Sequence, residues 1–447
     1  MNQVEELGNG PVNKLIFKYS MPAIIGLIIN AAYVMIDRAF IGNLPDHRGG
    51  LALSGIGATM PITTIVMAVA ACIAFGSLAQ ISMALGQADK SKAKKVVGNA
   101  LTISVISGLL ITIFYYLFKD AIFNLIGISP EIYDYANDFI STLMFGTIFS
   151  ILSFALPVLI RGDGSPNIAS LIMLTGAVFN IVLDWIFLFS FGWGIKGAAV
   201  ATIISQILVM LISLLYMNRT KSIIKPKMND FKLNKIILSG IFSVGMVPMF
   251  TQLSISISQV ISNFAFQNYG GVLYIGAMAT ISSITMLIMM VVSGINQGIM
   301  PILSYNVAQK NSERVNKTFF NSLKFASLFL VIAWIAIQFL SSQMVSIFSN
   351  DANLRAISAN GLRLYNFLLP LVAFNSMVPM ILSLIGKAKF ATGSNILRQL
   401  IIYPVLIISL PIFLGNNGLW LSQPTSECLI FILNFILLKK FFVSNIK

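Results

Sequence analysis

Twelve apolar stretches, each long enough to cross a lipid bilayer, constrain the fold more than any other feature of the sequence. A helix needs roughly 20 apolar residues to span the hydrocarbon core. Within lipid each backbone N–H and C=O group must find a partner in the protein, and a helix satisfies them within one segment. We therefore predict twelve membrane-spanning helices, at residues 15–41, 51–85, 96–118, 135–160, 168–191, 197–217, 236–266, 272–303, 319–340, 364–385, 396–414 and 419–442.

Composition favours an all-α polytopic membrane protein. Hydrophobic residues make up 57% and charged residues 10% of the 447 residues, and the mean hydropathy is +0.87. Soluble domains carry roughly 25% charged residues. The first residues lack the basic stretch, short apolar run and small-residue cleavage site of a signal peptide, so we expect the first apolar stretch to stay in the membrane.

The basic residues predict the orientation of the spans. Of the 29 Lys and Arg residues, 23 fall on one side, among them Arg161 and Arg398, whereas Arg38 lies inside the first span. An excess of basic residues marks the cytoplasmic side, so both termini are predicted to be cytoplasmic. Because these residues are spread over alternate short loops, the net charge of +14 does not predict a nucleic-acid partner.

The two halves of the sequence resemble each other. The longest polar connection, residues 218–235, divides the spans six and six and predicts two lobes, residues 1–217 and 236–447. Because six is an even number of spans, the lobes form a parallel repeat, which suits a cavity that opens to alternate sides. One constant shift along the sequence aligns Gly76 with Gly298, Gln87 with Gln309, Lys92 with Arg314, Lys95 with Lys317, Asn99 with Asn321 and Pro157 with Pro379.

Three acidic residues lie inside predicted spans: Asp37, Asp184 and Glu427. A charge at the bilayer centre costs about 2.5–3.5 kcal/mol on insertion scales, so an acid in a span indicates a function. Asn180 and Asp184 are four residues apart and share one face of a helix. At about 1.5 Å per residue, Asp37, Asp184 and Thr202 lie roughly 7–12 Å from the outer ends of their spans.

The side chains at this depth offer carboxylate, amide and hydroxyl oxygens, which are the ligands that hard cations prefer. Two carboxylates close together in a low dielectric also favour uptake of a proton by one of them. Asp37, Asn180, Asp184 and Thr202 are therefore predicted to bind Na⁺, H⁺ or both. Asp37 aligns with Asn263 in the repeat, and Asp184 aligns with an apolar segment, so the site is predicted in the first lobe only.

The residues alone leave an alternative to this site open. Asp37 could instead pair with Arg38 or Lys196 near the surface, while Asp184 makes a polar contact between helices. Adjacent residues point about 100° apart on a helix, which argues against a direct pair of Asp37 with Arg38.

Two further residues in the spans each have two interpretations. Glu427 stands alone in the last span, near Gln423, and either makes a polar contact within the second lobe or contacts substrate or a proton. Pro22 lies inside the first span, where a proline frees a backbone carbonyl and bends the helix. This bend is either a hinge that moves Asp37 or a static feature.

Six segments, in their order and spacing, resemble the multidrug and toxic compound extrusion (MATE) transporters over nearly the whole chain. The resemblance is closest to the bacterial branch with an acid in the first span and Asn-x-x-x-Asp in the fifth. The segments are residues 20–22 (SMP), 33–42 (YVMIDRAFIG), 161–164 (RGDG), 180–185 (NIVLDW), 197–202 (GAAVAT) and 418–424 (GLWLSQP).

The resemblance implies two six-helix bundles that form a V, and export of cationic lipophilic compounds by antiport against Na⁺ or H⁺. It implies a functional monomer in the bacterial cytoplasmic membrane, with lipid and small organic cations as partners, no enzymatic activity and no cofactor beyond the coupling ion. The implied cation ligands are Asp37, Asn180, Asp184 and Thr202, with Asn30 and Tyr33 on the same helix face as Asp37 and helix bending at Pro22. The sequence itself adds Arg38 and Glu427 as accessory residues.

Two rival functions predict different residues. A lipid-linked saccharide flippase of the same superfamily needs a basic cavity for pyrophosphate. Away from their ends the predicted spans hold one basic residue, Arg38, with Lys324 and Arg363 at the edges of spans. Arg38 also departs from the small or polar residue that usually follows the acid in MATE transporters. A membrane enzyme such as a polyprenyl transferase needs acidic metal-binding motifs, but the acids of the cytoplasmic loops are scattered singly.

Overall fold

The computed structural model describes residues 5–42, 49–128, 130–218, 224–347 and 352–443, and these ranges are helical apart from turns and short connections. The helices are α1 (Glu5–Asn9), α2 (Val12–Gly42), α3 (Gly49–Gly86), α4 (Lys90–Ile126), α5 (Pro130–Phe145), α6 (Thr147–Gly162), α7 (Pro166–Trp185), α8 (Gly194–Met217), α9 (Lys235–Ala308), α10 (Ser312–Ser346), α11 (Ala352–Tyr365), α12 (Leu371–Leu384), α13 (Ala388–Ile396), α14 (Tyr403–Leu414) and α15 (Asn416–Leu438). Shorter helical turns are η1 (Ile186–Ser190), η2 (Met228–Phe231), η3 (Leu397–Ile402) and η4 (Lys439–Val443).

The prediction of an all-α polytopic membrane protein is confirmed. Among the described residues ten helical segments are long and apolar enough to cross a membrane. The pair α5 and α6, bent by 59°, makes an eleventh span if it is counted as one. The predicted span 364–385 falls on the end of α11, a turn and the short apolar helix α12. The 14 residues of α12 are too few to cross a bilayer by themselves.

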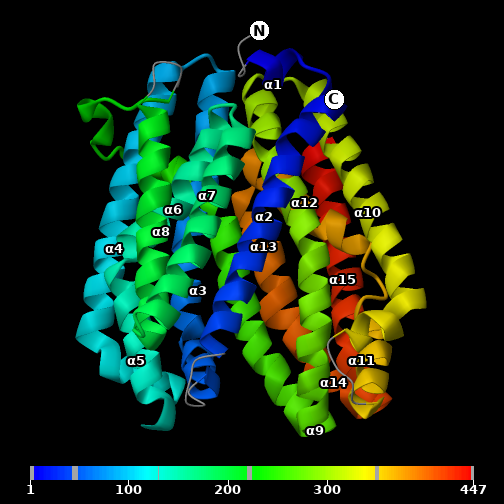
Figure 1. The fold of residues 1–447 in the computed structure, drawn as a ribbon. Helices are drawn as coiled ribbons and strands as arrows, with labels where there is room; N and C mark the ends of the chain where they lie inside the picture. Colours follow the sequence, from blue (N-terminus) through cyan, green and yellow to red (C-terminus); the bar gives the residue numbers. More distant parts are fainter. Residues whose placement is uncertain (1–4, 43–48, 129, 219–223, 348–351, 444–447) are drawn as a thin grey trace. The chain divides into compact units, whose positions relative to one another are not determined.

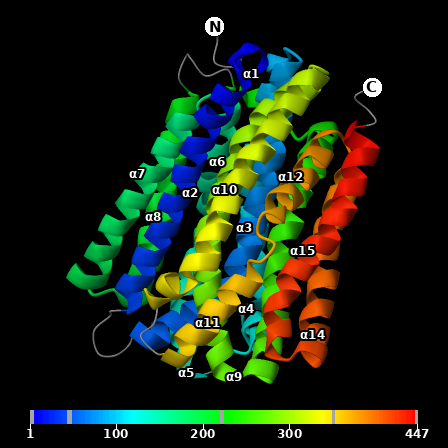
Figure 2. The same ribbon diagram turned by 90° about the vertical axis from the view of Figure 1, so that its right-hand side faces the viewer.

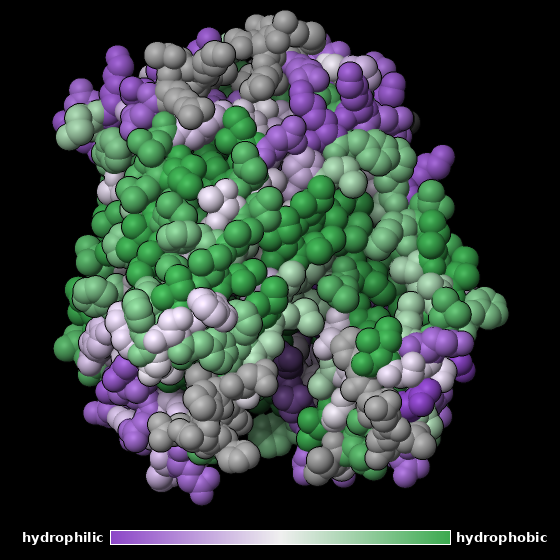
Figure 3. All heavy atoms as spheres, viewed as in Figure 1, coloured by the Kyte–Doolittle hydropathy of each residue, from purple (hydrophilic) through white to green (hydrophobic). Residues whose placement is uncertain are grey.

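Apolar side chains cover the middle of the helices, and polar side chains gather at both ends (Figure 3). On α4, for example, Leu110, Phe114 and Leu117 are exposed, and these positions follow the spacing of one helix face. Large exposed apolar surfaces of this kind are rare on soluble monomers. Contact with lipid therefore explains why these residues lie on the outside.

The helices form two compact units. Unit 1 consists of Met1–Gly10 and Met21–Met249, and unit 2 consists of Pro11–Ser20 and Phe250–Lys447. In unit 1, α6 packs against α3, α4, α7 and α8 (Figure 1). In unit 2, α15 packs against α11, α12, α13 and α14 (Figure 2).

The boundaries of the two compact units differ from those of the predicted lobes in two helices, α2 and α9. The first turns of α2 belong to unit 2, and the first turns of α9 belong to unit 1. Both transitions lie beside a proline, Pro22 in α2 and Pro248 in α9. The division into residues 1–217, 218–235 and 236–447 therefore stays a proposal.

The sequence repeat recurs in the positions at which helices begin. The shift that aligns Gly76 with Gly298 also aligns the first residues of four pairs of helices, which are α4 and α10, α5 and α11, α7 and α13, and α8 and α15. The N-caps of the first pair correspond as well, because the side chains of Asp89 and Asn311 accept hydrogen bonds from backbone N–H groups three residues later. The sequence repeat is therefore a structural repeat.

Two aligned glycines mark close helix contacts in the two units. In unit 1, a Cβ on Gly76 of α3 would lie 2.1 Å from the carbonyl oxygen of Ile241 in α9. In unit 2, a Cβ on Gly298 of α9 would lie 2.5 Å from the Cα atom of Ser20 in α2. Each unit thus holds the first turns of a crossing helix against a glycine, where no other side chain fits.

We expect Gly76→Ala to lower the unfolding temperature of the purified protein in detergent, because the added methyl group overlaps a backbone carbonyl that cannot rotate away. Overpacking of this kind costs about 1–3 kcal/mol. Gly57→Ala in the same helix is the control, since no atom lies within 4 Å of its added Cβ. Equal unfolding temperatures for the two variants would contradict the contact.

Candidate functional site

Three helices of unit 1 carry the four predicted cation ligands. Asp37 lies on α2, Asn180 and Asp184 lie on α7, and Thr202 lies on α8, which packs against α7. Asp184 is 0% exposed and Asn180 is 2% exposed, whereas Asp37 and Thr202 are half-buried. The Asp37 and Asp184 carboxylates are close enough for their charges to interact. The structure thus brings together Asp37 and Asp184, the two acids that the sequence places inside spans of this unit.

The polar atoms of this group lack partners in the described part of the chain. Both carboxylate oxygens of Asp184, both polar side-chain atoms of Asn180 and one oxygen of Asp37 are buried without a hydrogen bond. Buried polar groups are nearly always paired, because an unpaired one loses its interaction with water. A bound cation or proton would supply what these oxygens lack, so the residues fit a site for a hard cation.

Thr202 adds a hydroxyl oxygen to this set. Its hydroxyl donates a hydrogen bond to the backbone carbonyl of Ala198, one turn earlier, at 3.0 Å. Because the proton is used within α8, the lone pairs of the oxygen remain available as acceptors. The hydroxyl can therefore act as a cation ligand but not as a donor to the carboxylates.

An apolar cluster contains one residue from each of the three helical segments, one helical turn from Asp37, Asp184 or Thr202. Ile41 follows Asp37 by four residues, Leu188 follows Asp184 by four, and Ala198 precedes Thr202 by four. These apolar residues are buried in one cluster with Ala52, Ile56, Phe139, Ile195 and Ala199. The cluster keeps water from one side of the carboxylates, which strengthens their interaction with a bound cation.

A π-helical turn directly follows Asp184. It is η1, in which the N–H of Phe191 donates to the carbonyl of Ile186, five residues earlier, at 2.9 Å. Single π-helical turns within α-helices are rare and often occur at functional sites. Here the regular helix ends one residue after Asp184, and Leu188 of the following turn packs in the apolar cluster.

The surface ion pair proposed for Asp37 as an alternative is wrong with respect to Lys196. Lys196 pairs with Asp138 of α5 at 3.0 Å. Arg38 is exposed, and its charge interacts with that of Asp37. Tyr33 is half-buried one turn before Asp37, and the side chain of Asn30 lies outside the described part of the structure.

Pro22 has a partner that the sequence did not predict. The hydroxyl of Ser170 on α7 donates to the carbonyl of Pro22 on α2 at 2.6 Å. Arg161, which the sequence analysis placed among the cytoplasmic residues, is 1% exposed in the structure. Its guanidinium lies 3.4 Å from the sulfur of Met173, which is also on α7. The α2 segment at Pro22 is thus held by the helix that carries Asn180 and Asp184.

Comparison with known proteins decides the family. The family model MatE matches residues 22–186 and 248–408, which is most of the chain and includes both repeats. The chain belongs to the MatE family. Members of this family are membrane transporters, which confirms the expectation that the chain is not an enzyme.

Relatives of this MatE chain carry a common name. The multidrug export protein MepA of Staphylococcus aureus (strain bovine RF122 / ET3-1) is 26% identical over 419 residues, covering 94% of this chain and 92% of the relative. MepA of Staphylococcus saprophyticus subsp. saprophyticus is 26% identical over 416 residues, covering 93% and 91% of the two chains.

Solved structures share the fold of the MatE chain. A transporter of the MOP superfamily from Pyrococcus furiosus superposes with a TM-score of 0.93 at 24% identity, covering 100% of this chain and 99% of that chain. An outward-facing multidrug resistance MATE family transporter superposes with a TM-score of 0.92 at 24% identity, covering 99% and 98%. At this sequence identity the superpositions show that the fold is shared.

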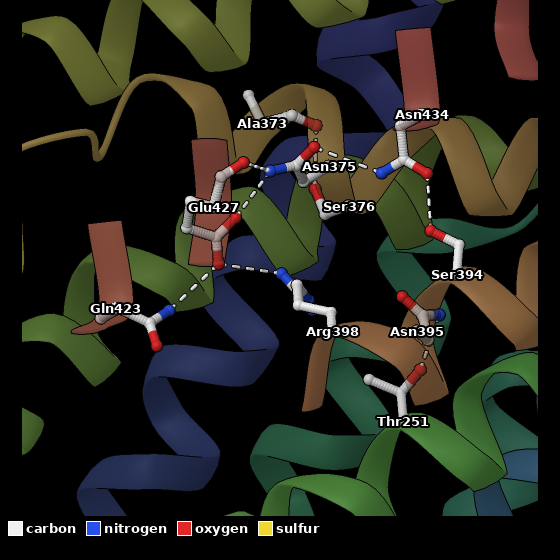
Figure 4. A network of polar contacts seen from close by, with 10 residues as sticks. All are labelled: Thr251, Ala373, Asn375, Ser376, Ser394, Asn395, Arg398, Gln423, Glu427 and Asn434. Carbon is white, nitrogen blue, oxygen red and sulfur yellow. Dashed lines mark hydrogen bonds and ion pairs between the residues drawn. The ribbon is translucent and has the colours of Figure 1, made fainter. Parts of the chain in front are cut away.

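Unit 2 of the MatE chain also contains a buried acid, Glu427, whose contacts agree with the first of its two interpretations, a polar contact within the second lobe. Glu427 is 2% exposed and accepts hydrogen bonds from Arg398, Asn375 and Gln423 (Figure 4). Arg398, which the sequence analysis counted with the cytoplasmic residues, lies inside a helical segment long enough to cross a membrane. The predicted span began at residue 396, but the helical segment that holds Arg398 begins at Ala388 and passes through η3, which buries the guanidinium.

Cation binding at the site in unit 1 should stabilise the folded protein. We expect NaCl, or acidification in the absence of Na⁺, to raise the unfolding temperature of the wild type in detergent relative to choline chloride. A ligand at 100 times its Kd stabilises the folded state by about 2.7 kcal/mol. The response should disappear in Asp184→Asn, because the amide removes the charge that attracts the cation.

Asp138→Asn is the matched control, since it removes a carboxylate of the same unit that already pairs with Lys196. This variant should keep the response of the wild type. A full response in Asp184→Asn would remove Asp184 from the site.

Proposed function

We propose that this MatE chain is a secondary antiporter that exports cationic lipophilic compounds and couples their export to entry of Na⁺ or H⁺. The observation that carries the proposal is the group of Asp37, Asn180 and Asp184. Among the described residues, one oxygen of Asp37 and both polar side-chain atoms of Asn180 and of Asp184 are buried without a hydrogen-bond partner. Relatives that cover more than nine-tenths of the chain are named multidrug export proteins. These two findings support an ion-coupled exporter of several compounds.

Alternating access explains how such a site couples two movements. A ligand shifts a conformational equilibrium only by the difference in its affinity for the two states. The ion binds Asp37, Asn180, Asp184 and Thr202 in the state that releases the exported compound outside. Its release to the cytoplasm then lets the carrier bind the next compound. The site binds Na⁺ or H⁺ because its ligands are carboxylate, amide and hydroxyl oxygens.

The setting of this transport follows from the charges of the loops. The chain spans the bacterial cytoplasmic membrane several times, with both termini in the cytoplasm, as the positive-inside rule requires. It works as a monomer in contact with lipid. Residues 1–217 and 236–447 are the two lobes of the carrier, joined by residues 218–235.

A lipid-linked saccharide flippase is the weaker candidate. A carrier of pyrophosphate needs uncompensated basic side chains in its cavity. Arg398 is buried in a span, but Glu427 neutralises it at 3.1 Å. This charge pairing favours cationic over anionic cargo.

The transport test compares Asp37→Asn, Asp184→Asn and the control Asp138→Asn in proteoliposomes loaded with a fluorescent organic cation. An imposed Na⁺ or pH gradient should drive movement of the cation in the wild type and in the control. Both site variants should lose at least nine-tenths of the gradient-driven rate, because each removes one of the two carboxylates that attract the ion. Full gradient-driven transport by Asp37→Asn would overturn the assignment of the site.

We propose that Pro22 is a hinge that moves Asp37. Proline at this position removes one backbone hydrogen bond of α2, and the hydrogen bond from Ser170 to its carbonyl links the bend to α7. Pro22→Ala should restore the helical bond, slow transport several-fold and leave the cation-dependent rise in unfolding temperature intact.

Pro61→Ala, which changes a proline inside α3, is the control for the hinge and should transport at the rate of the wild type. Unchanged transport by Pro22→Ala would show that the bend in α2 is static.

A further inference from the structure

Unit 2 contains a polar network inside its membrane-spanning helices, centred on Glu427 of α15 (Figure 4). Arg398 of η3 lies with its Nη1 atom 3.1 Å from one carboxylate oxygen, and the side chains of the two residues are 12% and 3% exposed. The amide of Gln423 donates to the same oxygen at 3.0 Å. The amide of Asn375 on α12 donates to the other oxygen at 2.7 Å.

The amide of Asn375 that contacts Glu427 is hydrogen-bonded in turn to further polar side chains. Asn434 donates to the carbonyl oxygen of the Asn375 side chain at 3.2 Å, and Ser394 donates to that of Asn434 at 2.6 Å. The donors come from α12, α13, η3 and α15, so the network joins four segments of unit 2. The hydrogen bonds that the Glu427 carboxylate accepts in this network all come from N–H donors.

The carboxylates of the two units therefore have opposite surroundings. Asp184 faces a second carboxylate and an amide and has no hydrogen-bond donor on either oxygen among the described residues. Glu427 has three donors, one of them a permanent cation. An arginine stays charged in proteins and carries no acceptor, so it repels a metal ion and leaves no free carboxylate charge to attract one.

We propose that Arg398 is a built-in counter-cation that excludes the coupling ion from unit 2. The guanidinium occupies the position at which Na⁺ or a proton would otherwise neutralise Glu427. A membrane segment cannot carry an uncompensated charge cheaply, so a carboxylate without Arg398 takes up a proton or a cation instead. Removal of this one side chain therefore converts a structural network into a second ion site.

The consequence for transport rests on the proposed function. If the cation site of unit 1 couples transport, Arg398 restricts ion exchange to that site and so sets the number of ions for each transport cycle. The charge assignment of Glu427 itself depends only on contacts within unit 2.

The test labels buried carboxyl groups with dicyclohexylcarbodiimide, which reacts with protonated carboxyls, followed by peptide mass spectrometry. Wild type, Arg398→Met, Arg398→Lys and the control Arg363→Met are treated in detergent at the same pH. The peptide with Glu427 should be labelled at least tenfold more in Arg398→Met than in the other three proteins. Arg398→Lys keeps the positive charge, and Arg363 contacts Ser341 rather than Glu427.

Labelling of Glu427 in the wild type at the level of Arg398→Met would overturn the proposal, as would its absence in a folded Arg398→Met protein. If Arg398→Met does not fold, Arg398→Met/Glu427→Gln decides. Recovery of folding in this double variant supports a charge pair, whereas failure of both variants shows that Arg398 is needed for another reason and overturns the proposal.

The labelling keeps this proposal separate from the proposed function. Asp37 and Asp184 lie on other peptides, and their labelling reports on the site in unit 1. The Glu427 result therefore stands or fails independently of whether unit 1 binds the coupling ion.

Discussion

The rest of the structure depends on the low dielectric of the bilayer, in which every polar group must find a partner within the protein. Backbone groups meet this requirement by forming helices along nearly the whole described chain. Charged side chains meet it in two ways. Glu427 obtains a permanent counter-charge and two amide donors, whereas Asp37 and Asp184 are left with unpaired oxygens that a mobile cation can satisfy.

These two solutions occupy a repeated frame. Four pairs of helices begin at positions related by one constant shift, and the aligned glycines Gly76 and Gly298 each receive the first turns of a crossing helix. The frame is therefore symmetric while its chemistry is not. One copy holds a fixed ion pair, and the other holds a group of unpaired acceptors. Under the function proposed above, only the second of these responds to ion gradients.

The sequence places the candidate site residues where helix geometry alone sets position. The shared face of Asn180 and Asp184, and the depths of Asp37 and Thr202 in their helices, follow from the regular turn and rise of an α-helix. The prediction failed where a span boundary was misplaced. Arg398 was counted at the cytoplasmic end of its span because the predicted span began only two residues before it, at residue 396, although the helical segment begins at Ala388.

The sequence by itself determined the all-helical class and the repeat, because hydrophobic length and helical periodicity are local properties. Only the tertiary structure decided which polar groups meet. Ser170 reaches the carbonyl of Pro22, and Asn375 and Arg398 reach Glu427, across 148, 52 and 29 residues of sequence. Such partners depend on how helices rotate and pack against one another, which the spacing along a single helix does not specify.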